Sequence, residues 1–280
     1  MDSQQVLKPV CRVAVIGAGV MGAGIAAQAA NAGADVLLLD IPPRGVAPNA
    51  PVAERNAIAA AAVERMLQAG AAGAFMDSTV AERVQVGNTE DDLNRLGEAD
   101  WIVEVVVERL DVKQDLYRRI ESVRAPDAIV SSNTSTIPLA TLMEGMPQSL
   151  REHFVVTHFF NPPRYMRLLE LVSSAETHPA VTERVRSFID QGMGKTVIHC
   201  NDRPGFIANR LGVYWMQVAL QEAIAMGLSV EDADAVMQVC GFPKTGIFGL
   251  WDLVGIDLMP EVTASLARLL EEDDPFQAYA

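Results

Sequence analysis

The sequence of 280 residues lacks several features that would assign it to a particular class. No uninterrupted apolar run approaches the ~18 residues that a membrane-spanning helix needs, and the stretch before Val13 has no signal or transit-peptide pattern. Its three cysteines, Cys11, Cys200 and Cys240, are widely scattered, which excludes a metal motif and favours free thiols in a reducing compartment. We therefore expect a cytoplasmic protein with no membrane insertion, no disulfide and no bound metal.

Positive charge is also scarce. The chain has 22 Lys and Arg residues against 36 Asp and Glu residues, which gives a net charge of −14. A field of that sign repels nucleic acid and anionic lipid, so we expect neither as a partner. A polyanionic ligand must instead be held locally, for example by backbone amides at the N-terminus of a helix.

Apolar segments and helical segments alternate over the first two hundred residues. Short apolar runs, typical of buried parallel strands, occupy residues 12–16, 36–39, 83–86, 101–107, 128–132, 154–159 and 168–172. Helical spacing is present at 20–32, 52–69 and 111–123, and the last helix carries a capping-box pattern of Asp111 with Gln114. This alternation predicts an α/β protein with a doubly wound, mostly parallel sheet of the Rossmann type.

The pattern changes after Asp202. Residues 206–271 show helical spacing with almost no β-branched runs, so we place a boundary between a domain of residues 1–202 and a smaller, all-helical domain of residues 203–280. Its first helix, predicted over 206–226, is apolar on much of its circumference. Burial against a partner subunit, in addition to its own domain, would explain that composition.

The first strand is followed by a glycine-rich loop. Gly17, Gly19 and Gly22 form the G-x-G-x-x-G pattern, which serves a tight turn, the approach of a pyrophosphate, and close packing of helix on strand. The next strand ends in Asp40, eighteen residues after Gly22. A carboxylate there binds ribose hydroxyls and repels a 2′-phosphate, so the pattern predicts NAD rather than NADP, although Arg44 nearby leaves NADP open.

Two polar residues lie in otherwise apolar strands. His158 lies within one predicted strand and Glu170 within the next, and a carboxylate in such a run is costly unless a donor meets it. Paired with Glu170, the imidazole of His158 would have a fixed tautomer and the basicity that a general base needs. Purely structural roles for both residues are the alternative.

Other polar residues follow the ends of predicted strands, where open α/β sheets bind ligands. Ser135 closes the turn Ser-Asn-Thr-Ser after one strand, and Asn161 follows His158 closely. Turn and helix-cap asparagines are common, so the pattern alone leaves binding and structural roles open for these residues and for Asn209.

Taken in order, these motifs resemble those of L-3-hydroxyacyl-CoA dehydrogenases, and the resemblance covers nearly the whole chain. The motifs are Gly17-x-Gly19-x-x-Gly22, Val106-Val107-Glu108 with Lys113, Ser132-Asn133-Thr134-Ser135, His158-Phe159-Phe160-Asn161-Pro162, Glu170, and Pro204-Gly205-Phe206-Ile207-Ala208-Asn209-Arg210.

The resemblance implies roles for individual residues. His158 would be the catalytic base and Glu170 its orienting partner, while Ser135 and Asn161 would bind the reacting oxygen of the substrate and Asn209 would also line that site. The implied NAD contacts are Gly17, Gly19, Val20, Met21, Gly22, Asp40, Val107, Glu108, Lys113 and Ser135. The implied reaction converts a 3-hydroxyacyl-CoA and NAD⁺ into a 3-ketoacyl-CoA and NADH, in a homodimer formed through the helical domain.

The sequence departs from the family pattern in two places. The segment 52–69, where the family binds CoA phosphates, offers mainly Arg55 and Arg65 and no lysine, and the chain ends at Ala280 without the family's closing helical segment. The segments Pro243-Lys244-Thr245-Gly246 and Phe160-Asn161-Pro162-Pro163-Arg164-Tyr165-Met166 resemble the dehydrogenase part of multifunctional fatty-acid oxidation proteins, so we expect the N-terminal dehydrogenase part of such a protein. The alternatives are a dehydrogenase of a free hydroxy acid, of the gulonate type, and a noncatalytic module that binds NAD or CoA.

Overall fold

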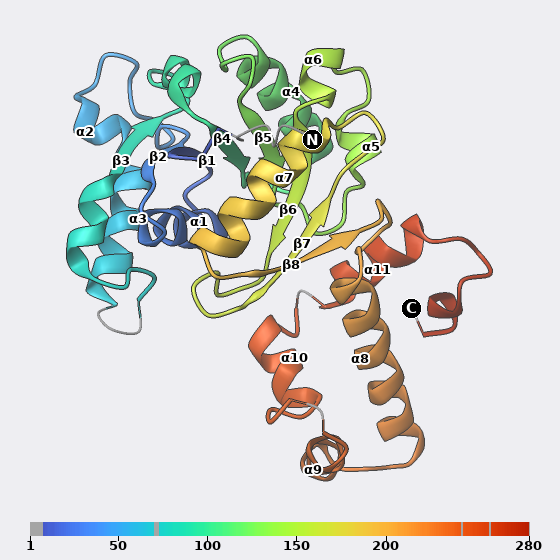
Figure 1. Cartoon of the computed structure of the whole chain (residues 1–280). Helices are drawn as coiled ribbons and strands as arrows, with labels where there is room; N and C mark the ends of the chain where they lie inside the picture. Colours follow the sequence, from blue (N-terminus) through green and yellow to red (C-terminus); the bar gives the residue numbers. More distant parts are fainter. Residues whose placement is uncertain (1–7, 70–72, 242, 258, 280) are drawn as a thin grey trace. The chain divides into compact units, whose positions relative to one another are not determined.

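The computed structural model describes residues 8–69, 73–241, 243–257 and 259–279. The chain divides into two compact units, Met1–Asp202 and Arg203–Ala280, called here the first and second unit (Figure 1). The first unit is an α/β structure and the second is helical, as the sequence predicts.

A single sheet of eight strands forms the centre of the first unit, in the order β3-β2-β1-β4-β5-β6-β7-β8. All neighbours are parallel except β6 and β7, which are antiparallel. The strands are β1 (Arg12–Ile16), β2 (Asp35–Asp40), β3 (Val84–Asn88), β4 (Trp101–Glu104), β5 (Ile129–Ser132), β6 (Phe154–Phe159), β7 (Leu168–Val172) and β8 (Thr196–Cys200).

The strand order reverses at β1, since β2 lies on one side of it and β4 on the other. Loops that leave β1 and β4 in opposite directions open a crevice at the carboxyl ends of these strands, which is where open α/β sheets bind ligands. The predicted doubly wound fold is therefore confirmed, and it fixes the edge of the sheet at which a site is expected.

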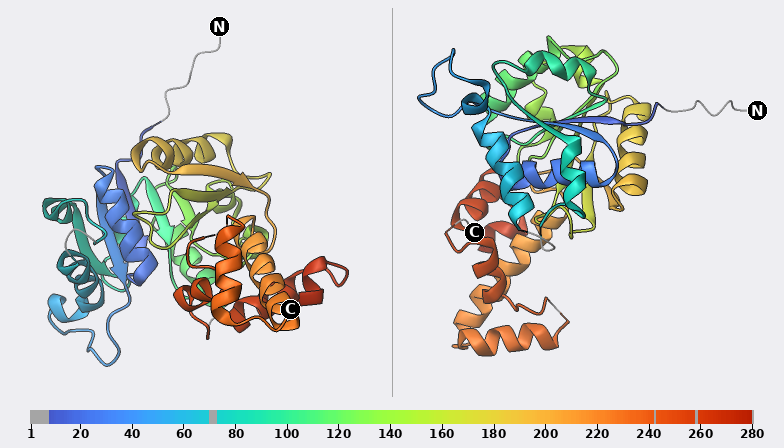
Figure 2. Two further views of the ribbon diagram at one scale, coloured as in Figure 1. Left: turned by 90° about the horizontal axis from the view of Figure 1, so that it is seen from below. Right: turned by 90° about the vertical axis from the view of Figure 1, so that its left-hand side faces the viewer.

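Helices cover both faces of this sheet (Figure 2). The helices and helical turns of the first unit are α1 (Val20–Asn31), α2 (Val52–Arg55), α3 (Ala57–Gln68), η2 (Ser78–Arg83), η3 (Leu93–Glu98), α4 (Leu110–Glu121), α5 (Leu139–Leu142), α6 (Gln148–Arg151), α7 (Pro179–Ser187) and the π-helical η4 (Phe188–Gly192). Residues of α1, α3 and α7 share one apolar cluster with alternate residues of the strands. Because α1 is rich in alanine and glycine, its backbone lies close to the sheet.

The structure corrects two details of the predicted elements. The strand expected over 101–107 ends at Glu104, because the N–H of Val106 bonds to the Glu104 side chain instead of a neighbouring strand. The expected capping box is also wrong: α4 begins at Leu110, so Asp111 lies in its first turn, paired with Arg109, and Gln114 donates to the carbonyl of Thr141.

Other differences concern segments around the sheet. The helix expected over 52–69 is divided at Asn56, whose side-chain oxygen accepts a hydrogen bond from Asn88. Strand β8 and helix α7 were not predicted. The charged and polar residues of 179–200 mask the apolar pattern there, since only a minority of the residues in each element is buried.

The second unit consists of α8 (Ala208–Ala225), α9 (Val230–Val239), α10 (Phe248–Val254), α11 (Met259–Leu269) and a final turn η5 (Pro275–Tyr279). Val213, Met216, Leu266 and Phe276 contribute to its core. Within this unit the carboxylate of Asp234 in α9 accepts hydrogen bonds from three N–H groups at the start of α10. None of the helices in the described ranges combines the length and hydropathy needed to cross a membrane.

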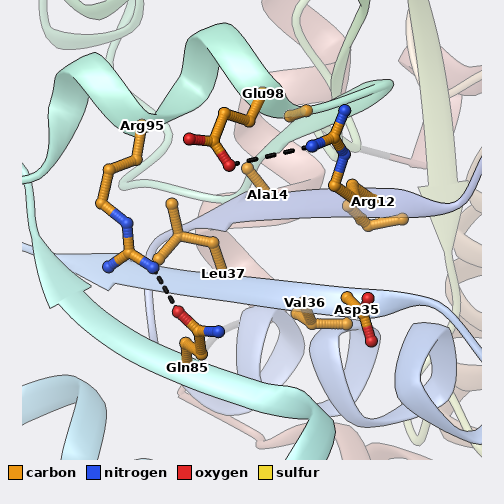
Figure 3. A pocket seen from close by; sticks show the side chains of 10 residues that line it. Arg12, Ala14, Asp35, Val36, Leu37, Gln85, Arg95 and Glu98 are labelled. Atoms are coloured by element: carbon orange, nitrogen blue, oxygen red, sulfur yellow. Dashed lines mark hydrogen bonds and ion pairs between the residues drawn. The ribbon is translucent and has the colours of Figure 1, made fainter.

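A small cavity of about 80 Å³ lies on the sheet beneath η3, next to the first residues of β1 and β2 (Figure 3). Its arginines already have polar partners on the cavity wall: Arg95 donates to Gln85, and Arg12 lies 3.8 Å from Glu98. The cavity is at the amino ends of the strands, opposite the edge of the sheet where open α/β sheets bind ligands.

Candidate active site

The loop after β1 is closely packed at two of its three glycines. Gly17 has a φ of 109°, and a Cβ there would lie 2.4 Å from the carbonyl oxygen of Val105. A Cβ on Gly22 would lie 1.8 Å from the carbonyl oxygen of Gly17, whereas one on Gly19 would meet nothing within 4 Å. Gly17 and Gly22 therefore shape the turn, and Gly19 leaves open space in front of it, as close approach of a pyrophosphate requires.

Helix α1 begins at Val20 directly after this loop, with Gly19 as its N-cap. No side chain caps it, and its first turn contains no acidic residue. The N–H groups of Val20, Met21 and Gly22 at this end fit a phosphate group, helped by the positive end of the helix dipole.

Asp40 ends β2 at the same edge of the sheet. One of its carboxylate oxygens accepts a hydrogen bond from the N–H of Ala18 at 2.6 Å, and the other accepts one from the N–H of Ile41 at 2.7 Å. The carboxylate is thereby fixed beside the glycine loop, with further lone pairs for ribose hydroxyls. The residues present thus fit a dinucleotide.

On the other side of the glycine loop a pocket of about 360 Å³ opens toward β4 and β5. Its lining includes Met21, Val107, Glu108, Lys113 and Asn133. The structure therefore brings the predicted residues Val20, Met21, Val107, Glu108 and Lys113 to one pocket.

Glu108 is held from two sides at this pocket. The Lys113 ammonium lies 3.1 Å from one carboxylate oxygen, and the other oxygen accepts hydrogen bonds from the Thr134 hydroxyl and from the N–H of Ser135. Partial burial raises the pKa of Glu108, but the Lys113 charge and these hydrogen bonds outweigh it, so the pKa is lower than that of an ordinary glutamate. Glu108 is therefore ionised at neutral pH.

His158 and Glu170 form a buried pair. They face each other across the antiparallel strands β6 and β7, and Nδ1 of His158 lies 2.8 Å from a carboxylate oxygen of Glu170. His158 is 5% exposed and Glu170 is 1% exposed. Nδ1 is thus engaged by the carboxylate, which leaves Nε2 as the nitrogen for proton transfer.

Cys200 of β8 extends this arrangement. Its thiol contacts the Glu170 carboxylate, and burial together with that negative charge raises the pKa of Cys200 to about 11. The cysteine therefore stays protonated near Glu170 and is an inert thiol, not a nucleophile.

The remaining predicted residues lie in different places. Ser135 is half-buried in the turn after β5, and Asn161 is exposed after β6, the neighbouring strand. Asn133 acts structurally, because its side-chain oxygen accepts a hydrogen bond from the N–H of Phe159. Asn209 lies in α8 of the second unit. Within the described ranges no group of side chains has the composition of a metal site.

A separate groove of about 280 Å³ runs beside α1, between α3 and the turn of residues 161–165. Arg65, Asn161, Arg164 and Tyr165 line it. Arg55, the other cation noted in this region, is unsuited to an external phosphate, because both ends of its guanidinium bond to the Asp91 carboxylate.

Lys195 was not singled out from the sequence. It is 4% exposed, its ammonium donates to the carbonyls of Pro163 and Met166, and burial lowers its pKa. It fixes the turn that carries the groove. A buried lysine after a glycine gives no sequence signal that distinguishes it from an exposed one.

Glu104 was also missed. It ends β4 with 0% exposure, and its two oxygens accept four hydrogen bonds, from Lys113, Val106, Tyr117 and Ser132. A signal was present, since Glu104 interrupts an apolar run just as Glu170 does.

Comparison with known proteins identifies the family. The model of the 3-hydroxyacyl-CoA dehydrogenase NAD binding domain matches residues 12–203, and the model of the C-terminal domain of the same enzymes matches residues 205–280. The chain belongs to the 3-hydroxyacyl-CoA dehydrogenase family. It is accordingly an NAD-dependent dehydrogenase, and the glycine loop with Asp40 fits its cofactor.

Individual relatives agree. A probable 3-hydroxyacyl-CoA dehydrogenase of Deinococcus radiodurans is 44% identical over 95% of this chain and 75% of its own length. A putative trifunctional enzyme of the fatty acid oxidation complex in Rickettsia felis is 42% identical over 98% of this chain, which spans 37% of that longer protein. The crystal structure of Mycobacterium tuberculosis FadB2 has a TM-score of 0.79 at 31% identity, covering 96% of this chain and 90% of that one.

Proposed function

We propose that this enzyme oxidises L-3-hydroxyacyl-CoA to 3-ketoacyl-CoA, with His158 as the general base and Glu170 as the residue that orients it. The buried contact of 2.8 Å between these two side chains carries the proposal. The proposal is also supported by the cofactor loop, which lies at the same edge of the sheet as His158. Relatives named as 3-hydroxyacyl-CoA dehydrogenases support it as well.

In this mechanism the protein contributes acid–base chemistry and positioning. His158 takes the proton of the substrate hydroxyl at Nε2, while its Nδ1–H remains bonded to Glu170, whose charge stabilises the resulting imidazolium. NAD supplies the acceptor for the hydride that leaves carbon 3. The burial of His158 and Glu170 keeps water away from this bond and strengthens it.

We further propose that Ser135, Asn161 and Asn209 hold the reacting oxygen of the substrate. Ser135 and Asn161 follow β5 and β6, which are neighbours, so both side chains start from the edge where His158 lies. Hydroxyl and amide donors would fix the oxygen for the transfer and stabilise charge that develops on it. The contribution of Asn209 rests on its place in the family motif.

The groove beside α1 is our proposed site for the CoA part of the substrate. Asn161 lines it, so the groove leads from the reacting centre, and Arg65 and Arg164 supply positive charge in a chain of net charge −14. Tyr165 is 55% exposed there and offers an aromatic surface to the adenine or pantetheine group.

A dehydrogenase of a free hydroxy acid is the second candidate, favoured by the engagement of Arg55 with Asp91, which leaves few cations for CoA phosphates. The test measures NADH formation with 3-hydroxybutyryl-CoA and with L-gulonate. We expect a clear preference for the CoA ester, and a preference for L-gulonate would contradict the proposal. If NAD binds but neither substrate nor a longer acyl-CoA reacts, the noncatalytic module is the better account.

We also propose a homodimer formed through the second unit, and a cytoplasmic location. The dimer is supported by large apolar side chains that α8, α9 and α10 leave exposed, among them Leu211, Ile224, Val239 and Leu253. The location is supported by free cysteines, of which Cys11 and Cys240 are exposed. Light scattering of the purified protein tests the dimer, and a monomer mass would refute it.

A further inference from the structure

Three charged side chains form a continuous chain from the core to the cofactor pocket. Glu104 is buried, and one of its oxygens lies 2.7 Å from the Lys113 ammonium. The same ammonium lies 3.1 Å from Glu108, which lines the pocket with a side chain that is 38% exposed. Lys113 itself is 1% exposed, so its charge is confined between the two carboxylates.

The charges of Glu104, Lys113 and Glu108 do not cancel. Two carboxylates face one ammonium, which leaves one unit of negative charge at the pocket wall. Glu104 has three other partners, which are the hydroxyls of Tyr117 and Ser132 and the N–H of Val106. None of them is charged at neutral pH, because burial and the Glu104 charge raise the pKa of Tyr117 above that of an ordinary tyrosine. The lowered pKa of Glu108 means that this carboxylate is ionised, which agrees with one excess negative charge.

This pocket lies on the side of the glycine loop where the nicotinamide belongs. Asp40 on β2 marks the adenosine side, and the strand order places β4 and β5, with His158 on β6 beyond them, on the opposite side of β1. The oxidised nicotinamide ring is positively charged and the reduced ring is neutral. A negative wall therefore attracts only the oxidised form through its net charge.

We propose that the chain Glu104–Lys113–Glu108 tunes the cofactor preference of this enzyme toward NAD⁺ relative to NADH. The inference rests on the proposed function, which places the nicotinamide in this pocket. Once a hydride has been accepted, the attraction disappears, so the reduced cofactor is held less tightly. The excess charge thereby favours release of NADH, a step that often limits turnover.

The test compares dissociation constants of NAD⁺ and NADH, measured by titration without acyl substrate. The variants are Glu108→Gln and Glu104→Gln, each of which removes the excess charge and retains the shape of the side chain. Asp111→Asn is the matched control, because it also removes one negative charge, from the first turn of α4, the helix that carries Lys113. The Asp111 side chain is 67% exposed and paired with Arg109.

We expect Glu108→Gln to raise the ratio of the NAD⁺ constant to the NADH constant roughly three- to tenfold, and Glu104→Gln to raise it in the same direction. A general loosening of the pocket would weaken the binding of both cofactors alike, so it would leave this ratio unchanged. A ratio unchanged in Glu108→Gln, or changed no more than in Asp111→Asn, would overturn the inference even if Glu104→Gln fails to fold. Because no acyl substrate is present, such a result leaves the proposed reaction untouched, whereas wild-type protein that binds neither cofactor overturns both.

Discussion

Replacing Glu170 by glutamine tests the role of the buried pair. The amide has the same shape as the carboxylate and can still accept a hydrogen bond from Nδ1 of His158, so the change removes charge and little else. A hydrogen bond to a charged group is worth about 1.5–3 kcal/mol and a neutral one about 0.5–1.5 kcal/mol, so stabilisation of the imidazolium falls by about 1–2 kcal/mol. Because each 1.36 kcal/mol is tenfold in rate, we expect kcat to fall about 5- to 30-fold.

The assay is NADH formation from 3-hydroxybutyryl-CoA, with NAD⁺ affinity measured separately. Glu176→Gln is the matched control, since Glu176 is an exposed carboxylate paired with Arg151. We expect the control to retain full activity and Glu170→Gln to keep wild-type NAD⁺ affinity. A folded Glu170→Gln protein with wild-type kcat would refute the reasoning, because the carboxylate would then contribute nothing to proton transfer.

Three further predictions follow from individual side chains. Cys11 and Cys240 should react with a thiol reagent at pH 8 well before Cys200, whose raised pKa and burial protect it; equal rates would contradict this. Burial raises the pKa of Asp100, but two backbone N–H bonds and a lysine lower it overall, so its stabilisation is full at neutral pH and is lost as the pH falls through that lowered value. Asp100→Asn should therefore lower the free energy of unfolding by about 1–3 kcal/mol at neutral pH, with a smaller difference in acid, as denaturant titrations can check. Asp40→Ser should raise the ratio of kcat/KM for NADP to that for NAD at least about tenfold, and an unchanged ratio would show that Asp40 does not select the cofactor.

The sequence carried most information where a residue type has one physical explanation. Gly17 and Gly22 sit where no Cβ fits, and a glutamate within an apolar run needs a partner, which His158 supplies. The same reasoning applied to Glu104 would have located its network, but the apolar run around it suggested a longer strand. The apolar pattern predicted the strand correctly but not its end, because the end is set by a hydrogen bond from the N–H of Val106 to the Glu104 side chain.

Other features depend on contacts that sequence spacing does not record. The engagement of Arg55 by Asp91 joins residues thirty-six positions apart, and for this reason our proposed CoA site uses Arg65 and not Arg55. Lys195, the residue before β8, donates to the carbonyls of Pro163 and Met166 in the turn before β7. In both cases the side chain alone suggests a surface cation, and only the fold shows what it contacts.

The central claim is that His158 is the base for oxidation of a 3-hydroxyacyl-CoA. Its most direct test is the His158→Gln variant, assayed for NADH formation and for NAD⁺ binding side by side. The account predicts a loss of turnover of about 10²- to 10⁴-fold with NAD⁺ affinity within about twofold of wild type. Turnover close to the wild-type rate in a correctly folded His158→Gln protein would contradict it.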